Sequence, residues 1–168
     1  TPIFWDDMPL KYADLWWLLH RPLTDDEIRK NWNTSRLDEA IKMFPKNCIY
    51  MRWHYEDPTV LSHQMLLEWY HKNGLNVMGA TAAATGETPF MARNNSRAQY
   101  IKDFCKLVSQ NQLKGILATA WDDASAHWET VMRGLIAQGE YSWHPDGRTV
   151  DEFIRAHARR EFGLSGQQ

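Results

Sequence analysis

Short apolar runs alternate with longer amphipathic segments along this chain. Each run is short enough for one buried strand, and each is followed by apolar residues spaced three and four positions apart, the spacing of a helix packed on one face. The four runs are Ile3–Trp5, Cys48–Met51, Leu75–Thr81 and Ile116–Ala120. The pattern therefore predicts four successive strand–helix units.

Capping signals place several of the helices. Thr24 and Glu27 form a Thr-x-x-Glu capping box, which starts a helix that reaches about Phe44 and breaks over residues 31–35. A second box, Thr149 with Glu152, starts a last helix that should stop at Gly163. Further helices are expected at Tyr12–His20, from residues 59–62 to Asn73-Gly74, from Asn95 or Ser96 through Val108, and from about Trp128 to Gly139. A long loop is expected over Ala82–Asn94.

Strands that alternate with helices of this length favour an α/β fold with a parallel sheet and right-handed crossovers. A complete (β/α)8 barrel needs at least about 200 residues, and this sequence has 168 residues. The expectation is one domain over residues 1–168: four consecutive βα units forming half of a TIM (β/α)8 barrel, plus a C-terminal helix. Four strands cannot close a barrel, so the first and last strands should each keep an unpaired edge. The apolar side chains expected on the inner, open face of the sheet should be only half covered: Ile3, Ile49, Met51, Val77, Ile116 and Ala118.

Composition excludes several classes of function. The formal net charge is −2, which gives no basic field for nucleic acid. No apolar run approaches the roughly 18 residues of a membrane span, so neither partner is expected. Cys48 and Cys105 fit no metal spacing and are expected as buried free thiols. Nine tryptophans exceed what a core of this size needs, and surplus indole is common where sugar rings are bound. The sequence does not indicate a compartment.

Aromatic and acidic residues follow three of the apolar runs. Trp5 precedes Asp6-Asp7, Trp121 precedes Asp122-Asp123, and the second run leads into residues 52–58, Arg-Trp-His-Tyr-Glu-Asp-Pro. In parallel βα barrels the chemistry lies where the strands end, which favours a functional site here. Simpler roles stay open: the aspartates at 122 and 123 as helix caps, Trp5 and Trp53 as core residues, and Tyr55 with Asp57 as a turn before Pro58.

These strand ends resemble those of glycoside hydrolase family 20, the β-N-acetylhexosaminidases, and most closely its hexosaminidase D branch. Residues 4–8, Phe-Trp-Asp-Asp-Met, resemble a strand end of the family, and residues 119–123, Thr-Ala-Trp-Asp-Asp, resemble a later one. Residues 55–57, Tyr-Glu-Asp, fit a Tyr-x-Asp element, and residues 136–143 are similar to the segment that closes the barrel. The resemblance covers nearly the whole chain and implies that it is the C-terminal half of the catalytic barrel.

The resemblance also implies a role for each strand end. Trp5, Trp53 and Trp121 would wall the sugar and its N-acetyl group, Tyr55 would belong to the same cup, and Asp7, Asp57 and Asp123 would accept hydrogen bonds from sugar hydroxyls. Catalysis in this family is substrate-assisted. The family's catalytic Asp-Glu pair, in its His-x-Gly-x-Asp-Glu context, is absent here, because Asp26-Glu27, Asp38-Glu39 and Asp151-Glu152 all lie in expected helices. No catalytic residue is therefore assigned, and the chain is expected to be a fragment, inactive alone. No cofactor is implied.

Partners and alternatives follow from this hypothesis. The expected ligand is a glycan or glycoside containing N-acetylhexosamine, and the sequence does not specify the sugar or the linkage. The expected protein partner is a missing N-terminal half-barrel or a second copy of the chain. A non-catalytic sugar-binding protein and a self-associating half-barrel remain alternatives. A metal site at Asp6, Asp7, His54, Asp122 and Asp123 is disfavoured because no His-x-His or His-Glu-x-x-His spacing occurs. Arg52 is expected to neutralise Asp6 or Asp7 from the neighbouring strand.

Overall fold

The computed structural model describes residues 1–85, 94–121 and 128–163. Along the chain the elements are β1 (Ile3–Trp5), α1 (Asp7–Tyr12), α2 (Trp16–Leu19), α3 (Asp25–Asn31), α4 (Ser35–Ala40), the 3-10 turn η1 (Ile41–Met43), β2 (Ile49–Trp53), α5 (Leu61–Lys72), β3 (Val77–Ala84), α6 (Asn94–Gln110), β4 (Ile116–Ala120), α7 (Trp128–Trp143) and α8 (Val150–Phe162). The sequence predicts the third strand over Leu75–Thr81, but β3 starts at Val77 and continues through Ala84, so the first residues of the predicted Ala82–Asn94 loop belong to the strand. Helix α6 starts at Asn94, and residues 86–93 lie outside the described residues.

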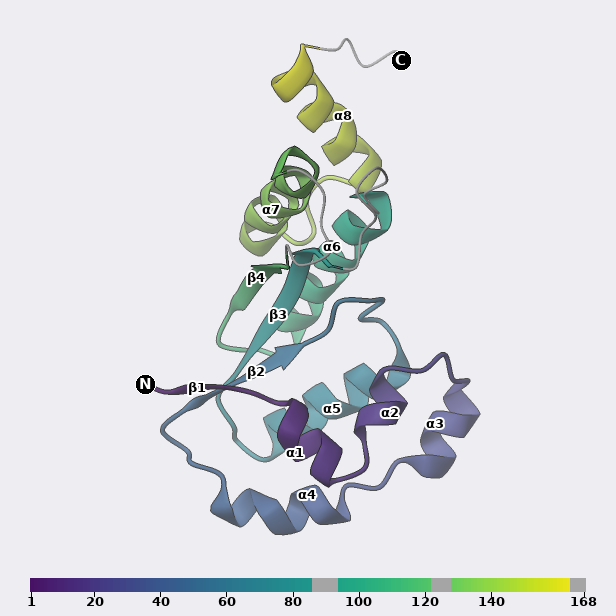
Figure 1. The fold of residues 1–168 in the computed structure, drawn as a ribbon, viewed down its shortest axis with the longest axis vertical. Helices are drawn as coiled ribbons and strands as arrows, with labels where there is room; N and C mark the ends of the chain where they lie inside the picture. The colour runs from purple at the N-terminus through teal and green to yellow at the C-terminus, as the bar shows by residue number, and fades with distance from the viewer. Residues whose placement is uncertain (86–93, 122–127, 164–168) are drawn as a thin grey trace.

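The four strands form one parallel sheet in the order β1-β2-β3-β4 (Figure 1). Each strand therefore lies beside the next one in the sequence, which confirms the predicted succession of βα units. Register places Trp5 beside Met51, Trp53 beside Ala80, and Ala80 beside Leu117. Along the long axis of the molecule, α1–α4 lie at the β1 end and α7 and α8 at the β4 end (Figure 1).

The predicted helix boundaries are confirmed where capping chemistry sets them. Both capping boxes are formed, at Thr24 and at Thr149, and Gly163 ends α8 in the left-handed conformation that favours glycine. The break over residues 31–35 separates α3 from α4 as expected. None of the described helices is long and apolar enough to cross a membrane.

Other boundaries also differ from the sequence prediction. The expected Tyr12–His20 helix is replaced by α1, which starts at Asp7 and holds Pro9 in its first turn where its missing N–H does no harm, and by the short α2. Strand β2 continues through Trp53. Helix α7 does not stop at Gly139 but continues to Trp143, because fully buried Tyr141 anchors its last turn and outweighs the weak helix propensity of one glycine.

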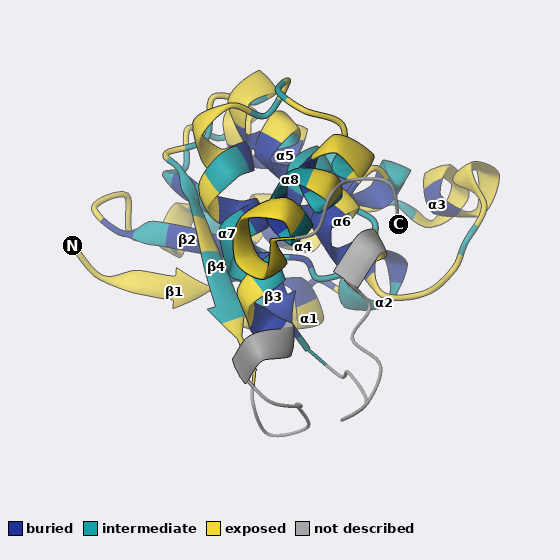
Figure 2. Ribbon diagram, turned by 90° about the horizontal axis from the view of Figure 1, so that it is seen from above, coloured by how far each residue is buried: buried dark blue, intermediate teal, exposed yellow. Residues whose placement is uncertain are grey.

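One face of the sheet is covered by helices. Tyr50 and Val77 lie side by side on this face and pack against Leu66 and Tyr70 of α5. At the other end, Ile116 packs against a cluster formed by α6, α7 and α8, whose members are Ala98, Ile101, Cys105, Ala137, Tyr141 and Phe153. Figure 2 shows the buried parts of the chain in the middle of the molecule and exposed residues along β1. Both cysteines are buried free thiols, as predicted.

The opposite face carries the alternate residues of each strand, and its ends are exposed. Met51, Ala80 and Ala82 are buried at its centre, whereas Ile3 and Leu117 are exposed on the outer strands. Ile49 and Met51 lie on this face as the sequence suggested.

Three residues expected on that open face, Val77, Ile116 and Ala118, lie on the helix-covered face instead. Val77 is in register with Tyr50, and Ile116 and Ala118 are in register with Gly79 and Thr81. Since successive side chains of a strand alternate between faces, an error of one residue in the assumed register reverses the assignment of a whole strand.

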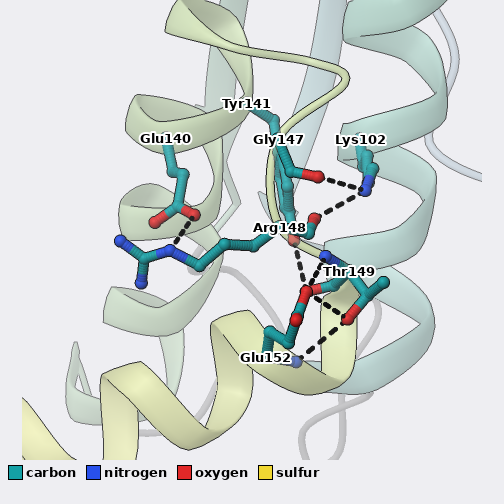
Figure 3. Close-up of polar contacts among 7 residues, drawn as sticks. All are labelled: Lys102, Glu140, Tyr141, Gly147, Arg148, Thr149 and Glu152. Carbon is teal, nitrogen blue, oxygen red and sulfur yellow. Dashed lines mark hydrogen bonds and ion pairs between the residues drawn. The ribbon is translucent and has the colours of Figure 1, made fainter.

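Helix α8 is fixed to α6 and α7 by polar contacts around the turn that precedes it (Figure 3). Lys102 of α6 donates to the carbonyl oxygens of Gly147 and Arg148, at 3.5 and 2.6 Å. Arg148 pairs with Glu140 of α7 at 3.3 Å. The predicted terminal helix is therefore an integral part of the helical layer.

Candidate functional site

Three of the predicted sugar-binding aromatics meet at the carboxyl ends of the strands. The rings of Trp53 and Tyr55 lie 4.9 Å apart, and those of Tyr55 and Trp121 lie 6.3 Å apart. Trp53 and Tyr55 are partly exposed, and Trp121 is 43% exposed, so its indole is not enclosed in the core. Segments that follow β2 and β4 thus contribute to one row of rings, which we call the aromatic row.

Two residues that the sequence analysis did not single out extend this row. Trp16 of α2 lies 5.0 Å from Trp53, and His20 lies 5.1 Å from Trp53 and 4.0 Å from Trp16. Their spacing of four residues places both rings on one side of a helical turn. That spacing was visible in the sequence, but nothing in it indicated that this turn would fold over the end of β2.

The four other predicted site residues are placed differently. Trp5 is 44% exposed on the edge strand, and its indole makes none of the ring contacts found among the described residues. Asp7 begins α1 and pairs with Lys11 at 3.0 Å. Asp57 accepts from the backbone N–H and the hydroxyl of Thr59, at 2.9 and 2.6 Å, which is the turn-shaping role left open above. Asp123, like Asp122, lies outside the described residues.

A buried arginine holds two of the strand-end segments together. Arg97 of α6 is 3% exposed, and it donates hydrogen bonds to the carbonyl oxygen of Tyr55 and, at 3.3 Å, to that of Thr85. Tyr55 follows β2 and Thr85 follows β3. The backbone that carries the middle ring of the aromatic row is therefore tied to the neighbouring strand end.

A charged network lies behind the aromatic row, on the covered face. Arg52 donates through one guanidinium nitrogen to both carboxylate oxygens of Asp6, each at 3.1 Å, and Tyr70 donates to Asp6 at 3.0 Å. Arg52 and Asp6 are fully buried. The expectation that Arg52 neutralises Asp6 across strands is confirmed. Burial raises the pKa of Asp6, while Arg52 and Tyr70 oppose that shift by stabilising the carboxylate.

Two stacked histidines continue this network. The rings of His54 and His63 lie 4.7 Å apart. His54 Nε2 lies 2.9 Å from the carbonyl oxygen of Asp57, so Nε2 carries the proton and Nδ1 faces Arg52 at 3.4 Å. His63 Nδ1 lies 2.9 Å from the carbonyl oxygen of Pro58 and is likewise the protonated nitrogen.

Both of these imidazoles are held neutral. Burial, together with the charge on Arg52, lowers the pKa of His54 to about 3. Burial, together with His54 and Arg52, lowers the pKa of His63 well below its ordinary value of 6.5. His20 is more exposed, yet packing against the tryptophans removes water from its ring and lowers its pKa to about 4.

The described residues suit binding better than acid–base chemistry. Asp6 is the carboxylic acid whose pKa burial raises, but it is fully enclosed and bonded to Arg52 and Tyr70, so it cannot reach a leaving group. Within residues 1–85, 94–121 and 128–163, no three side chains of His, Cys, Asp or Glu lie close enough to hold a metal ion. The aromatic row instead offers ring faces beside a few polar groups, the arrangement of many small-molecule sites.

Comparisons with known proteins do not identify a family for this chain: no protein-family model matches the sequence, and no curated protein matches it.

Proposed function

We propose that this chain is half of a βα barrel of the glycoside hydrolase type and that its aromatic row binds a sugar containing N-acetylhexosamine. The observation that carries the proposal is the meeting of Trp53, Tyr55 and Trp121 at the carboxyl ends of parallel strands. That is the edge at which barrels of this architecture place their ligands.

The way Trp121 is held fits a stacking role. Its indole N–H donates to the hydroxyl of Thr119 at 3.0 Å, and its backbone N–H donates to the carbonyl of Ala84 at 3.1 Å. The edge of the ring is therefore fixed, while a large part of the side chain stays in contact with solvent. An apolar ring face of fixed orientation is what the C–H face of a pyranose packs against.

The resemblance of residues 4–8, 55–57 and 119–123 to family 20 strand ends supports the sugar class. In that proposal the Asp-Glu pair comes from a complementing half-barrel, where the Glu protonates the leaving group and the Asp orients the acetamide. This chain supplies the wall of the cup. Alone, it should not hydrolyse an aryl N-acetylglucosaminide, because none of the acids in the described part of the chain is placed to protonate the leaving group. Turnover by the isolated chain that Asp123→Ala abolishes would contradict this assignment.

Binding is tested with two trisaccharides that share a β-1,4 backbone. Isothermal titration calorimetry should detect tri-N-acetylchitotriose and give a much weaker signal for cellotriose, which lacks the acetamido groups. Trp53→Ala and Trp121→Ala should each weaken binding by about tenfold or more, equivalent to about 1.4 kcal/mol. Phe162→Ala removes an exposed aromatic from α8 and serves as the matched control. Equal binding by all three variants, or no binding by the wild-type chain, would refute the proposal.

A non-catalytic sugar-binding protein is the second candidate, and it is favoured by the aromatic row, whose described residues offer ring faces rather than an acid placed for proton transfer. The two candidates predict the same binding results. They differ when a complementing half-barrel that carries the Asp-Glu pair is added to the chain. If the chain is half of a hydrolase, the mixture should hydrolyse an aryl N-acetylglucosaminide. If the chain is a non-catalytic sugar-binding protein, the mixture should not hydrolyse it.

A further inference from the structure

Most exposed large apolar side chains of the described residues gather at the two ends of the sheet. One group lies on β1 and α1, and a second on β4 and α7. The first comprises Ile3, Phe4, Trp5, Met8 and Tyr12, and the second Leu117, Trp121, Met132 and Trp143. Where exposed apolar side chains gather into a patch, they mark an interaction surface.

At the β1 end, both a strand edge and a helix lack a partner among the described residues. Ile49 N–H donates to the carbonyl of Pro2, and Asp6 N–H donates to the carbonyl of Met51. Residues two apart in a parallel strand bond to the same neighbour, so Ile3 and Trp5 direct their backbone groups away from β2. Beside this edge, Met8 and Tyr12 lie four residues apart on α1, and each is more than half exposed.

The β4 end repeats this arrangement. Gly115 and Trp121 bond to β3 through their backbone, so Ile116, Ala118 and Ala120 direct their N–H and C=O groups to the opposite edge. On α7, Met132, Ile136 and Trp143 recur at helical spacing, and Trp143 is 91% exposed. A groove of about 580 Å³ lies beside the C-terminal half of this stripe, where α7 faces α8 and the turn before it. Its lining includes Ile136, Gly139, Trp143, Gly147, Arg148 and Arg160.

Gly139 has no packing reason within its own chain. It lies inside α7, where glycine costs about 1 kcal/mol relative to alanine, yet a Cβ at this position would meet no atom within 4 Å. By contrast, a Cβ on Gly134 of the same helix would strike the backbone of Ala83. A glycine in the middle of an exposed apolar stripe lets another helix approach the groove closely.

We propose that a second copy of this chain docks on these two ends at once, so that two four-stranded sheets close into one eight-stranded barrel. This inference rests on the second candidate function, the non-catalytic sugar-binding protein, because a second copy occupies the strand edges that a complementing half-barrel would need. A twofold axis parallel to the strands keeps all strands parallel, and it pairs β4 of each copy with β1 of the other. The same rotation brings α7 of one copy beside the segment that follows β1 of its partner. Four plus four strands reach the number whose interior side chains just fill a closed barrel.

Self-complementarity is what favours a second copy as the occupant. Among the described residues, the β1 end and the β4 end each offer one unpaired parallel strand edge and one exposed apolar side of a helix. Both ends belong to one sheet. The β1 end of one copy can therefore pair with the β4 end of the other, and the reverse. Closed twofold dimers are the commonest assemblies of identical chains. Closure also removes both free edges, which otherwise invite open-ended pairing, and it encloses the exposed face of the aromatic row.

Sedimentation velocity at micromolar concentration, with no sugar present, tests the assembly separately from sugar binding. The chain should sediment as one species of twice its mass. A Cβ at position 139 meets no atom of its own chain within 4 Å. Gly139→Leu therefore projects a larger side chain into the groove, and it should raise the dimer dissociation constant about tenfold or more. Glu68→Leu, which adds the same side chain at an exposed position of α5, is the matched control and should leave the dimer intact.

Circular dichroism of each variant establishes that the fold is kept. A folded Gly139→Leu variant that dissociates, beside a dimeric Glu68→Leu variant, supports the proposal. A monodisperse wild-type monomer, a ladder of larger oligomers, or a Gly139→Leu variant as dimeric as the wild type would each overturn it. Sugar binding by a monomeric chain would leave the proposed function standing and remove only the dimer.

Discussion

Strand β2 presents two different surfaces to the two sides of the sheet. Tyr50, Arg52 and His54 point to the covered side, where Arg52 and His54 belong to a buried hydrogen-bonded network. Trp53 and Tyr55 belong to the opposite side, where their rings meet other partly exposed rings. Neighbouring residues of one strand thus serve different purposes, so stability and binding should respond to separate substitutions.

The largest loss of stability is expected from Arg52→Met. It removes the cation that neutralises fully buried Asp6, and breaking a buried pair in this way costs about 3–5 kcal/mol. Urea unfolding followed by circular dichroism measures the change. The double variant Asp6→Asn/Arg52→Met leaves no unpaired charge and should recover part of the loss. A double variant no more stable than Arg52→Met alone would show that the charge of Asp6 is not the cause.

Acid should weaken the covered side next. The unfolded chain takes up protons on its histidines as the pH falls below 6.5, whereas folded His54 and His63 stay neutral because their pKa values are lowered. Stability is therefore complete above pH 6.5 and falls by about 2 kcal/mol per histidine between pH 6.5 and 5. Asp6 acts in the opposite direction, because its raised pKa makes the folded state bind a proton more readily.

The free energy of unfolding at several pH values between 7.5 and 5 gives this slope. His54→Gln should flatten it, whatever its effect at neutral pH. Ser142→Ala, which removes no titratable group from an exposed position, should leave the slope as it is. A wild-type stability that does not change over this range would show that the two imidazoles are not held neutral.

A smaller effect is expected where α7 touches the sheet. A Cβ at Gly134 would lie 2.3 Å from the carbonyl oxygen and 2.7 Å from the Cα of Ala83. Backbone cannot move aside as a side chain can, so Gly134→Ala should destabilise the fold by about 1–3 kcal/mol. Ser142→Ala, at an exposed position of the same helix, is the control for urea unfolding. Equal stability of the two variants would mean that α7 is not held this closely to β3.

The smallest change in stability is expected on the exposed side. Trp121→Ala should cost about 1 kcal/mol or less, because its indole is partly exposed and leaves no large core cavity. The same variant should lose most of its sugar binding, which makes it the reverse of Arg52→Met. If Trp121→Ala unfolds the chain as readily as Arg52→Met does, the separation between the two sides of β2 is wrong.

Local chemistry made much of the fold predictable. The capping boxes at Thr24 and Thr149, and the glycine after α8, define helix ends through hydrogen bonds within a few residues. The Asp6–Arg52 pair was also accessible, because two adjacent strands each end in a charged residue of opposite sign. Such features depend on residue types and on short separations in the sequence.

The rest depended on long-range geometry. The strand register decides which face Val77 and Ile116 occupy, and register is a property of two strands rather than of one. Trp16 and His20 join the aromatic row only because α2 folds over the end of β2. The carboxylate of Asp57 accepts a hydrogen bond from the hydroxyl of Thr59 and so shapes a turn. No spacing within a single segment contains this information.

The hydrogen bonds of Arg97 hold part of the aromatic row in place before any ligand binds. By holding the carbonyls of Tyr55 and Thr85, this side chain sets the separation of two backbone segments in the absence of any ligand. A receptor whose contact groups already stand in their final positions loses little chain entropy when it is occupied. Ligand binding should then occur in one kinetic step. Its association rate should depend on diffusion and on the orientation of the ligand rather than on a rearrangement of the protein.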